Sequence, residues 1–139
     1  MEPEVKLRIA IVAGLFHTDH IDIMLAAAKA AAAEYNVDVT DIVRVPGSYE
    51  KPLAVKRLLQ RSTVDAVVVL GIIERGETAH GRVMGQTVSD ALVRLQLEFM
   101  KPVGIGILGP EIEPVQFASR REKYAADAVA AVVAMQKLS

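Results

Sequence analysis

Four apolar runs recur along the chain at roughly regular spacing, and each contains several valine or isoleucine residues. Side chains of this kind favour β-strands. The runs predict strands over Arg8–Ala13, Val37–Val45, Val64–Gly71 and Pro102–Leu108. The last two runs are almost continuously apolar, which is typical of strands that are buried on both faces of a parallel sheet.

Helical periodicity fills the stretches between these runs and the end of the chain. The first apolar stripe, with residues three or four apart, consists of Ile21, Leu25, Ala28, Ala32 and Tyr35. A second, shorter helix is predicted over Tyr49–Gln60, with Ser48 as its N-cap. The third stripe consists of Met84, Val88, Leu92, Leu95 and Phe99, and the final helix covers Ser119–Lys137.

The alternation of strands and helices predicts an α/β fold. Right-handed connections between parallel strands place the helices in two layers, one on each face of the sheet. Because no linker or low-complexity stretch interrupts residues 1–139, we expect one domain.

The last predicted helix is apolar on almost every side. Asp127 is its only charged residue between Ala125 and Ala134. A helix of this kind is usually buried on more than one side, so we expect a second subunit to cover it. The alternative is an alanine-rich surface helix, because alanine has the highest helix propensity.

The composition excludes several classes of protein. A net charge of -1 gives no strong attraction to nucleic acid or to an anionic membrane. The absence of cysteine excludes disulfide frameworks and cysteine nucleophiles, and it fits a cytosolic protein. The acidic first residues lack the pattern of a signal peptide, and the longest apolar runs are too short to span a bilayer. We therefore expect a cytoplasmic protein with no membrane or nucleic-acid partner.

Ligands of open parallel sheets bind beyond the carboxyl ends of the strands, so the segments that follow the predicted strands are the candidate sites. Residues 76–80 read Gly-Glu-Thr-Ala-His. Free amides ahead of a helix suit an anion such as phosphate, and His80 could transfer protons beside it. The alternative is an ordinary loop in which Thr78 caps the helix.

Two other strand ends carry unusual residues. The Pro46-Gly47 corner and the Ser48 hydroxyl could orient a polar ligand, or they could serve only to form a turn. Phe16 follows the first strand and is a candidate stacking surface for a flat heterocycle, although it could equally belong to the core.

Two further patterns are poor candidates for sites. Residues 104–109 have the GxGxxG spacing of dinucleotide-binding folds, but they lie inside a predicted strand and Pro110 follows them. His17 and His20 flank Asp19, but no third ligand has the spacing of a metal site. We expect neither a nucleotide cofactor nor a metal ion.

Taken in order, these segments resemble the lumazine synthase family. The similarity runs from Leu7 to about Met135, and its most specific parts are residues 45–54 and residues 76–80. Residues 65–71 and 101–103 agree in place and spacing. The short tail and residues 106–110 look more like archaeal members.

The resemblance implies a flavodoxin-like three-layer α/β/α sandwich with a four-stranded parallel sheet. It implies a homopentamer, which in some members builds an icosahedral shell, with active sites between adjacent subunits. Residues 1–6 would then add as a strand to the sheet of a neighbour. The implied reaction, part of riboflavin biosynthesis, condenses 5-amino-6-(D-ribitylamino)uracil with 3,4-dihydroxy-2-butanone 4-phosphate to 6,7-dimethyl-8-ribityllumazine. This transferase reaction uses no metal or organic cofactor.

The resemblance also implies roles for individual residues. Phe16 would stack on the pyrimidine, and His80 would move protons. The ribityl chain would be held by Ser48, Tyr49 and Glu50. The phosphate would be held by Gly76, Glu77 and Thr78, and by Arg120 from a neighbouring subunit. Ile105, which stands where many bacterial members have phenylalanine, is included among the substrate-binding residues.

Several residues depart from the pattern of the family, and they bear on activity more than on fold. These residues are His17, Lys51, Gly81, Arg82 and Asp127. A self-assembling pentameric or icosahedral scaffold of the same fold, with weak or no catalytic activity, is therefore the rival function. A flavin or nucleotide binder is a third reading that rests only on analogy of fold.

Overall fold

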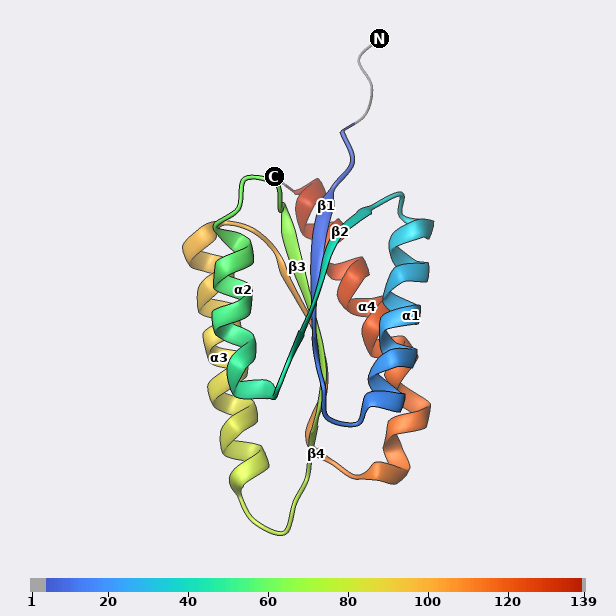
Figure 1. Cartoon of the computed structure of the whole chain (residues 1–139), viewed down its shortest axis with the longest axis vertical. Coiled ribbons are helices and arrows are strands. Elements are labelled where there is room, and N and C mark those ends of the chain that lie inside the picture. The colour runs from blue at the N-terminus through green and yellow to red at the C-terminus, as the bar shows by residue number, and fades with distance from the viewer. Residues whose placement is uncertain (1–4, 139) are drawn as a thin grey trace.

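The computed structural model describes residues 5–138 and shows a four-stranded parallel sheet between two pairs of helices (Figure 1). The strands are β1 (Arg8–Gly14), β2 (Asp38–Val45), β3 (Ala66–Glu74) and β4 (Val103–Ile112). The helices are α1 (Thr18–Glu34), α2 (Lys51–Leu59), α3 (His80–Phe99) and α4 (Phe117–Lys137). The strand order is β2-β1-β3-β4, and α1 and α4 cover one face while α2 and α3 cover the other. The predicted α/β sandwich is confirmed.

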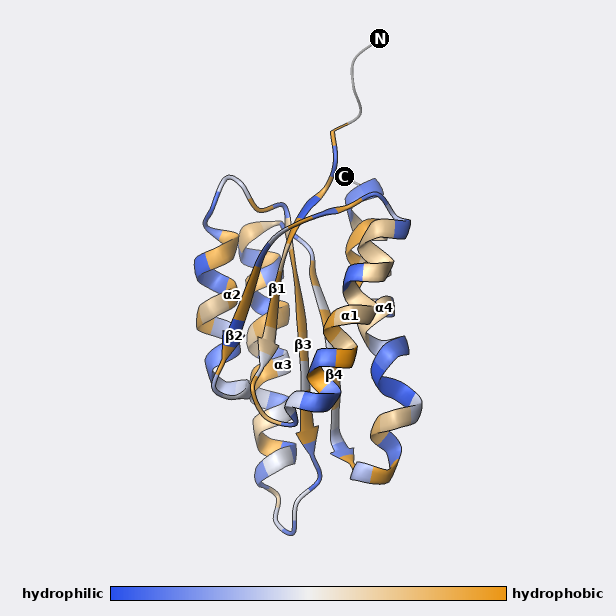
Figure 2. Cartoon of the chain, turned by 45° about the vertical axis from the view of Figure 1, so that its right-hand side comes forward, coloured by the Kyte–Doolittle hydropathy of each residue, from blue (hydrophilic) through white to orange (hydrophobic). Residues whose placement is uncertain are grey.

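The central strands bury side chains on both faces of the sheet. In β1, Ile9 and Ile11 join the core formed with α1 and α4, whereas Ala10 and Val12 join the core formed with α2 and α3. Strand β3 alternates in the same way. Since successive side chains of a strand point to opposite faces, only a continuously apolar run fits this position. Figure 2 shows this apolar character along β1 and β3.

Some element boundaries differ from the prediction. Strand β3 continues past Gly71 to Glu74, and β4 continues through Pro110 to Ile112, because the two strands remain paired up to the Glu74–Ile112 pair. The predicted N-cap role of Ser48 is wrong. A turn of 3-10 helix over Ser48–Glu50 precedes α2, and the helix begins at Lys51 without a side-chain cap.

Two glycines of the GxGxxG pattern allow close packing between β4 and α4. A Cβ atom on Gly104 would overlap the carbonyl oxygen of Ala128, and one on Gly106 would lie 3.1 Å from the carbonyl oxygen of Tyr124. The absence of side chains at these two positions therefore lets α4 approach the sheet, and it accounts for these two glycines without a nucleotide.

One chain buries only part of α4. Val129, Val132 and Val133 are buried against the sheet and α1, whereas Ala131 and Ala134 are exposed. The expected cover of this side by a second subunit stays a prediction. The predicted addition of residues 1–6 to a neighbouring sheet falls mainly on residues 1–4, which lie outside the described residues.

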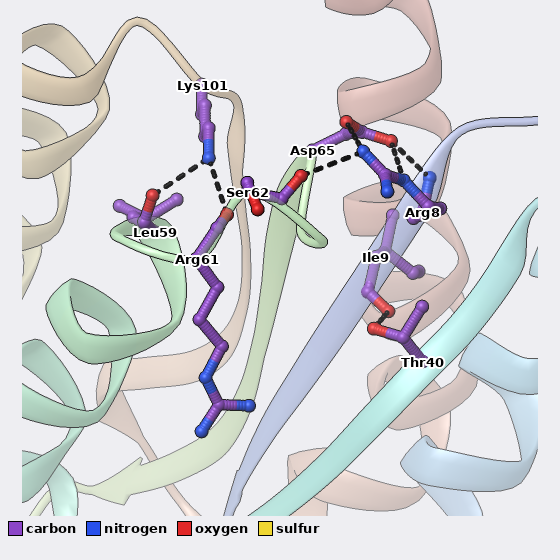
Figure 3. A network of polar contacts seen from close by, with 8 residues as sticks. All are labelled: Arg8, Ile9, Thr40, Leu59, Arg61, Ser62, Asp65 and Lys101. Atoms are coloured by element: carbon purple, nitrogen blue, oxygen red, sulfur yellow. Dashed lines mark hydrogen bonds and ion pairs between the residues drawn. The ribbon is translucent and has the colours of Figure 1, made fainter.

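A polar network holds the amino ends of the central strands together (Figure 3). The Arg8 guanidinium donates hydrogen bonds to both carboxylate oxygens of Asp65, at 2.9 and 3.0 Å, and to the Ser62 carbonyl oxygen. Lys101 Nζ donates to the carbonyl oxygens of Leu59 and Arg61. The Arg8 hydrogen bonds hold the pKa of Asp65 below its usual range. This network fixes the start of β1 and the loop before β3 at the edge opposite to the strand ends that carry the candidate site.

We expect Asp65→Asn to lower the melting temperature at pH 7 by about 4 °C, because the charge-assisted hydrogen bonds from Arg8 are weakened. The lowered pKa of Asp65 means that its contribution is present above the ordinary carboxyl pKa and is lost as the pH falls through the folded-state value. Melting curves of both proteins at pH 7 and pH 3 measure the difference. Asp90→Asn, which alters an exposed pair with Arg94, is the control. Equal melting temperatures at pH 7 would contradict the structural role of Asp65.

Candidate functional site

A cavity of about 440 Å³ lies at the carboxyl ends of the strands and is lined by residues from three distant parts of the chain. Seven of the ten predicted site residues line it, namely Phe16, Ser48, Tyr49, Glu50, Gly76, Thr78 and His80. The fold brings these residues together because parallel strands all end at the same edge of the sheet (Figure 1).

Three predicted residues do not line this cavity. Glu77 is exposed in the same loop as Thr78. Ile105 lies on β4 and borders a separate hollow with Tyr124 and Asp127. Arg120 lies in the first turn of α4, where its guanidinium donates to the Gln116 carbonyl oxygen at 3.3 Å and to Ser119 Oγ at 3.1 Å.

Phe16 is held at the mouth of the cavity and is not a core residue. Its side chain is 69% exposed. It faces the Pro46-Gly47 corner, where a Cβ atom on Gly47 would lie 3.5 Å from the Phe16 ring. His17, which follows it, adopts the left-handed conformation with a φ of 56° and starts α1. An exposed aromatic ring beside a glycine surface leaves room for a flat ligand.

The loop before α3 places His80 at the helix N-terminus. The Thr78 hydroxyl accepts a hydrogen bond from the His80 backbone N–H at 3.3 Å, and Thr78 lines the cavity, whereas Ala79 stands at the N-cap of α3 without a side-chain cap. The His80 ring lies 6.2 Å from the Tyr49 ring. A Cβ atom on Gly81 would lie 2.6 Å from the Glu74 carbonyl oxygen, so glycine permits α3 to start this close to the end of β3.

A histidine–carboxylate pair in the cavity was not predicted from the sequence. His17 Nε2 lies 3.5 Å from Glu74 Oε2, and both residues line the cavity. His20, the other histidine of the possible metal-binding pattern, does not take part in this pair. Its Nδ1 atom lies 2.9 Å from a guanidinium nitrogen of Arg121. Among residues 5–138 there is no group of three acidic or histidine side chains placed to hold a metal ion.

Lys51 is only 1% exposed and contacts a residue that lines the cavity. Its ammonium donates a hydrogen bond to Ser48 Oγ at 3.2 Å. It occupies a space left by two glycines, since a Cβ atom on Gly71 would overlap Lys51 Nζ and one on Gly14 would lie 3.6 Å from it. Burial lowers the pKa of Lys51 to about 8. From the sequence, Lys51 stood out only as a departure from the pattern of the family that the chain resembles. The neighbouring residues in the sequence do not show where its side chain lies.

The arrangement suits a ligand with three different parts. Phe16 offers a surface for a flat ring. Ser48 and Glu50 offer hydrogen-bonding groups beside it. The loop with Gly76 and Thr78 leads into the N-terminus of α3, where backbone amides favour an anion, and His80 stands next to that position.

Comparisons with known proteins agree with one another. A family model described as 6,7-dimethyl-8-ribityllumazine synthase matches residues 6–139. A relative of that name from Saccharolobus solfataricus is 38% identical over 130 residues, which is 94% of this chain and 84% of the relative. Another from Metallosphaera sedula is 40% identical over 132 residues, which is 95% of this chain and 87% of the relative. A third from Staphylothermus marinus is 40% identical over 128 residues, or 92% and 85% of the two chains.

Within residues 5–138, none of the helices combines the length and the apolar character that crossing a membrane requires.

We expect Lys51→Met to raise the free energy of unfolding at pH 7 by roughly 3 kcal/mol, because folding of the wild type must bury an ammonium group whose pKa falls from 10.5 to about 8. Between pH 8 and 10.5 the unfolded chain binds more protons at Lys51 than the folded chain does. The wild type therefore gains stability there, and the advantage of the variant shrinks.

Urea unfolding of both proteins at pH 7 and pH 10 measures this difference. Lys56→Met, on the same helix but with a half-exposed side chain, is the matched control. A Lys51→Met protein that is less stable than the wild type at pH 7 would show that the ammonium is favourably bound.

Proposed function

The chain belongs to the 6,7-dimethyl-8-ribityllumazine synthase family, and we propose that its cavity condenses 5-amino-6-(D-ribitylamino)uracil with 3,4-dihydroxy-2-butanone 4-phosphate. The product is 6,7-dimethyl-8-ribityllumazine, a step of riboflavin biosynthesis, and phosphate and water are released. The observation that carries the proposal is the gathering of seven predicted site residues, from three loops, around one cavity.

Each part of the cavity has a role in this reaction. The pyrimidine ring stacks on Phe16, and the ribityl chain is held by Ser48, Tyr49 and Glu50. The loop with Gly76, Glu77 and Thr78 receives the phosphate at the N-terminus of α3. His80 moves protons while the amine attacks the carbonyl carbon, phosphate leaves and the ring closes. Because the amine is already a nucleophile, the protein contributes mainly alignment of the two substrates and proton transfer.

We further propose that neighbouring copies of this one-domain chain complete the site. Arg120 lies outside the cavity of its own chain and would reach the phosphate bound by an adjacent copy. Ile105 and the exposed alanines of α4 would then lie at or near the contact between copies. The assembly proposed is a homopentamer or a shell built from pentamers, working in the cytoplasm without a metal or organic cofactor.

We expect His80→Ala to slow lumazine formation on the order of 10²-fold while the protein still assembles, because the variant loses proton-transfer help but keeps the binding surfaces. Product absorbance with both substrates present measures the rate, and light scattering measures assembly. Arg94→Ala, on the exposed side of the same helix, is the matched control.

An unchanged rate in His80→Ala would remove His80 from the reaction. A wild-type protein that assembles but forms no product would instead support the scaffold function.

A further inference from the structure

Lys51 and Ser48 are the buried polar or charged residues among those described, and they are bonded to each other. Lys51 stands at the first position of α2, and its side chain reaches the end of β1 and the interior of β3. Gly14, the last residue of β1, and Gly71, within β3, leave the space that its ammonium fills. The lysine is thus held in a slot between these glycines and in contact with Ser48, which lines the cavity.

The ammonium has fewer partners than its chemistry requires. It carries three N–H donors, and within residues 5–138 its hydrogen bond is to Ser48 Oγ, with no carboxylate within 4 Å. Buried charges are normally paired, because removing an ion from water is costly. A lysine in this slot therefore lowers the stability of the fold. A functional role for it must act through Ser48, its hydrogen-bond partner.

We propose that Lys51 is a positioning residue that fixes the direction of the Ser48 hydroxyl, so that this hydroxyl donates its hydrogen to an oxygen of the substrate's ribityl chain. The inference rests on the proposed function, because it assigns a role within the same site. Ser48 lines the cavity, whereas Lys51 is buried and is not among the residues that line it.

The donors and acceptors of the two side chains fix the direction of the Ser48 hydroxyl. A serine hydroxyl has one hydrogen and two lone pairs, and an ammonium group can only donate. When Lys51 donates to Ser48 Oγ, the serine hydrogen must point away from Lys51 Nζ. Ser48 also lines the cavity, so its hydrogen is free to turn toward a ligand bound there. A polyol oxygen is a suitable acceptor for it.

Loss of the proton from Lys51 reverses the direction of this bond. A neutral amine has a lone pair, so the Ser48 hydrogen can turn toward Nζ and the ligand loses its donor. Burial brings the pKa of Lys51 to about 8, within the range of an enzyme assay. The other titratable groups around the cavity are Glu50 and Tyr49 beside α2, His17 and Glu74 at the ends of β1 and β3, and His80 on α3.

The test compares Lys51→Met, Ser48→Ala, the double variant and the exposed-lysine control Lys56→Met. Each single variant at the buried pair is expected to raise the KM for the ribitylaminouracil about 10-fold, with kcat changed less than about 3-fold. The double variant is expected to match the single variants, since both remove one interaction. Gly71→Ala, whose methyl group displaces Nζ, is expected to raise the KM as well.

The pH profile separates positioning from a structural role. In the wild type and in Lys56→Met, KM is expected to rise as the pH passes about 8, and this inflexion is expected to be absent from Lys51→Met and Ser48→Ala. An unchanged KM in Lys51→Met, additive effects in the double variant, or the same inflexion without Lys51 would each overturn the inference and leave the proposed function standing.

A wild-type protein that forms no lumazine contradicts the proposed function separately. Calorimetric titration with the same ribitylaminouracil then decides the inference. Binding that is weakened about 10-fold in Lys51→Met but not in Lys56→Met supports it. Equal binding by all three proteins, or no binding by the wild type, overturns it.

Discussion

The pairing of β3 with both β1 and β4 is the constraint on which the rest of the molecule depends. With β1 and β3 in the middle of the sheet, the two helix layers cover both of their faces, and these strands carry almost only apolar side chains along their length. Polar chemistry is therefore confined to the two edges where strands begin and end. One edge holds the Arg8–Asp65 network, and the other holds the cavity.

Lys51 is the exception to this separation, and the sheet adapts to it through missing side chains. Gly14 at the end of β1 and Gly71 within β3 open a slot, so a long basic side chain from α2 can lie there and donate to Ser48. The buried ammonium reduces stability near neutral pH, as its lowered pKa shows. Sites that hold a destabilising polar group in a fixed geometry are common where binding or catalysis takes place.

The sequence predicted those features that a local pattern of residues determines by itself. Continuous apolar runs gave the central strands, and the rule that ligands bind beyond strand ends located the cavity. Prediction from the sequence failed for features that depend on contacts between residues far apart in the chain. The extension of β3 to Glu74 depends on β4, the His17–Glu74 pair joins two strand ends, and the slot for Lys51 requires glycines from two strands. No local signal marks such arrangements.

The central claim is that both substrates meet in the cavity at the carboxyl edge of the sheet. A crystal structure of the assembled protein with inorganic phosphate and an unreactive ribityl-pyrimidine tests this claim most directly. We expect the pyrimidine on Phe16, the ribityl chain at Ser48, and phosphate at the Thr78 loop beside His80. Ligands bound elsewhere, or a cavity that stays empty at saturating concentrations, would contradict it.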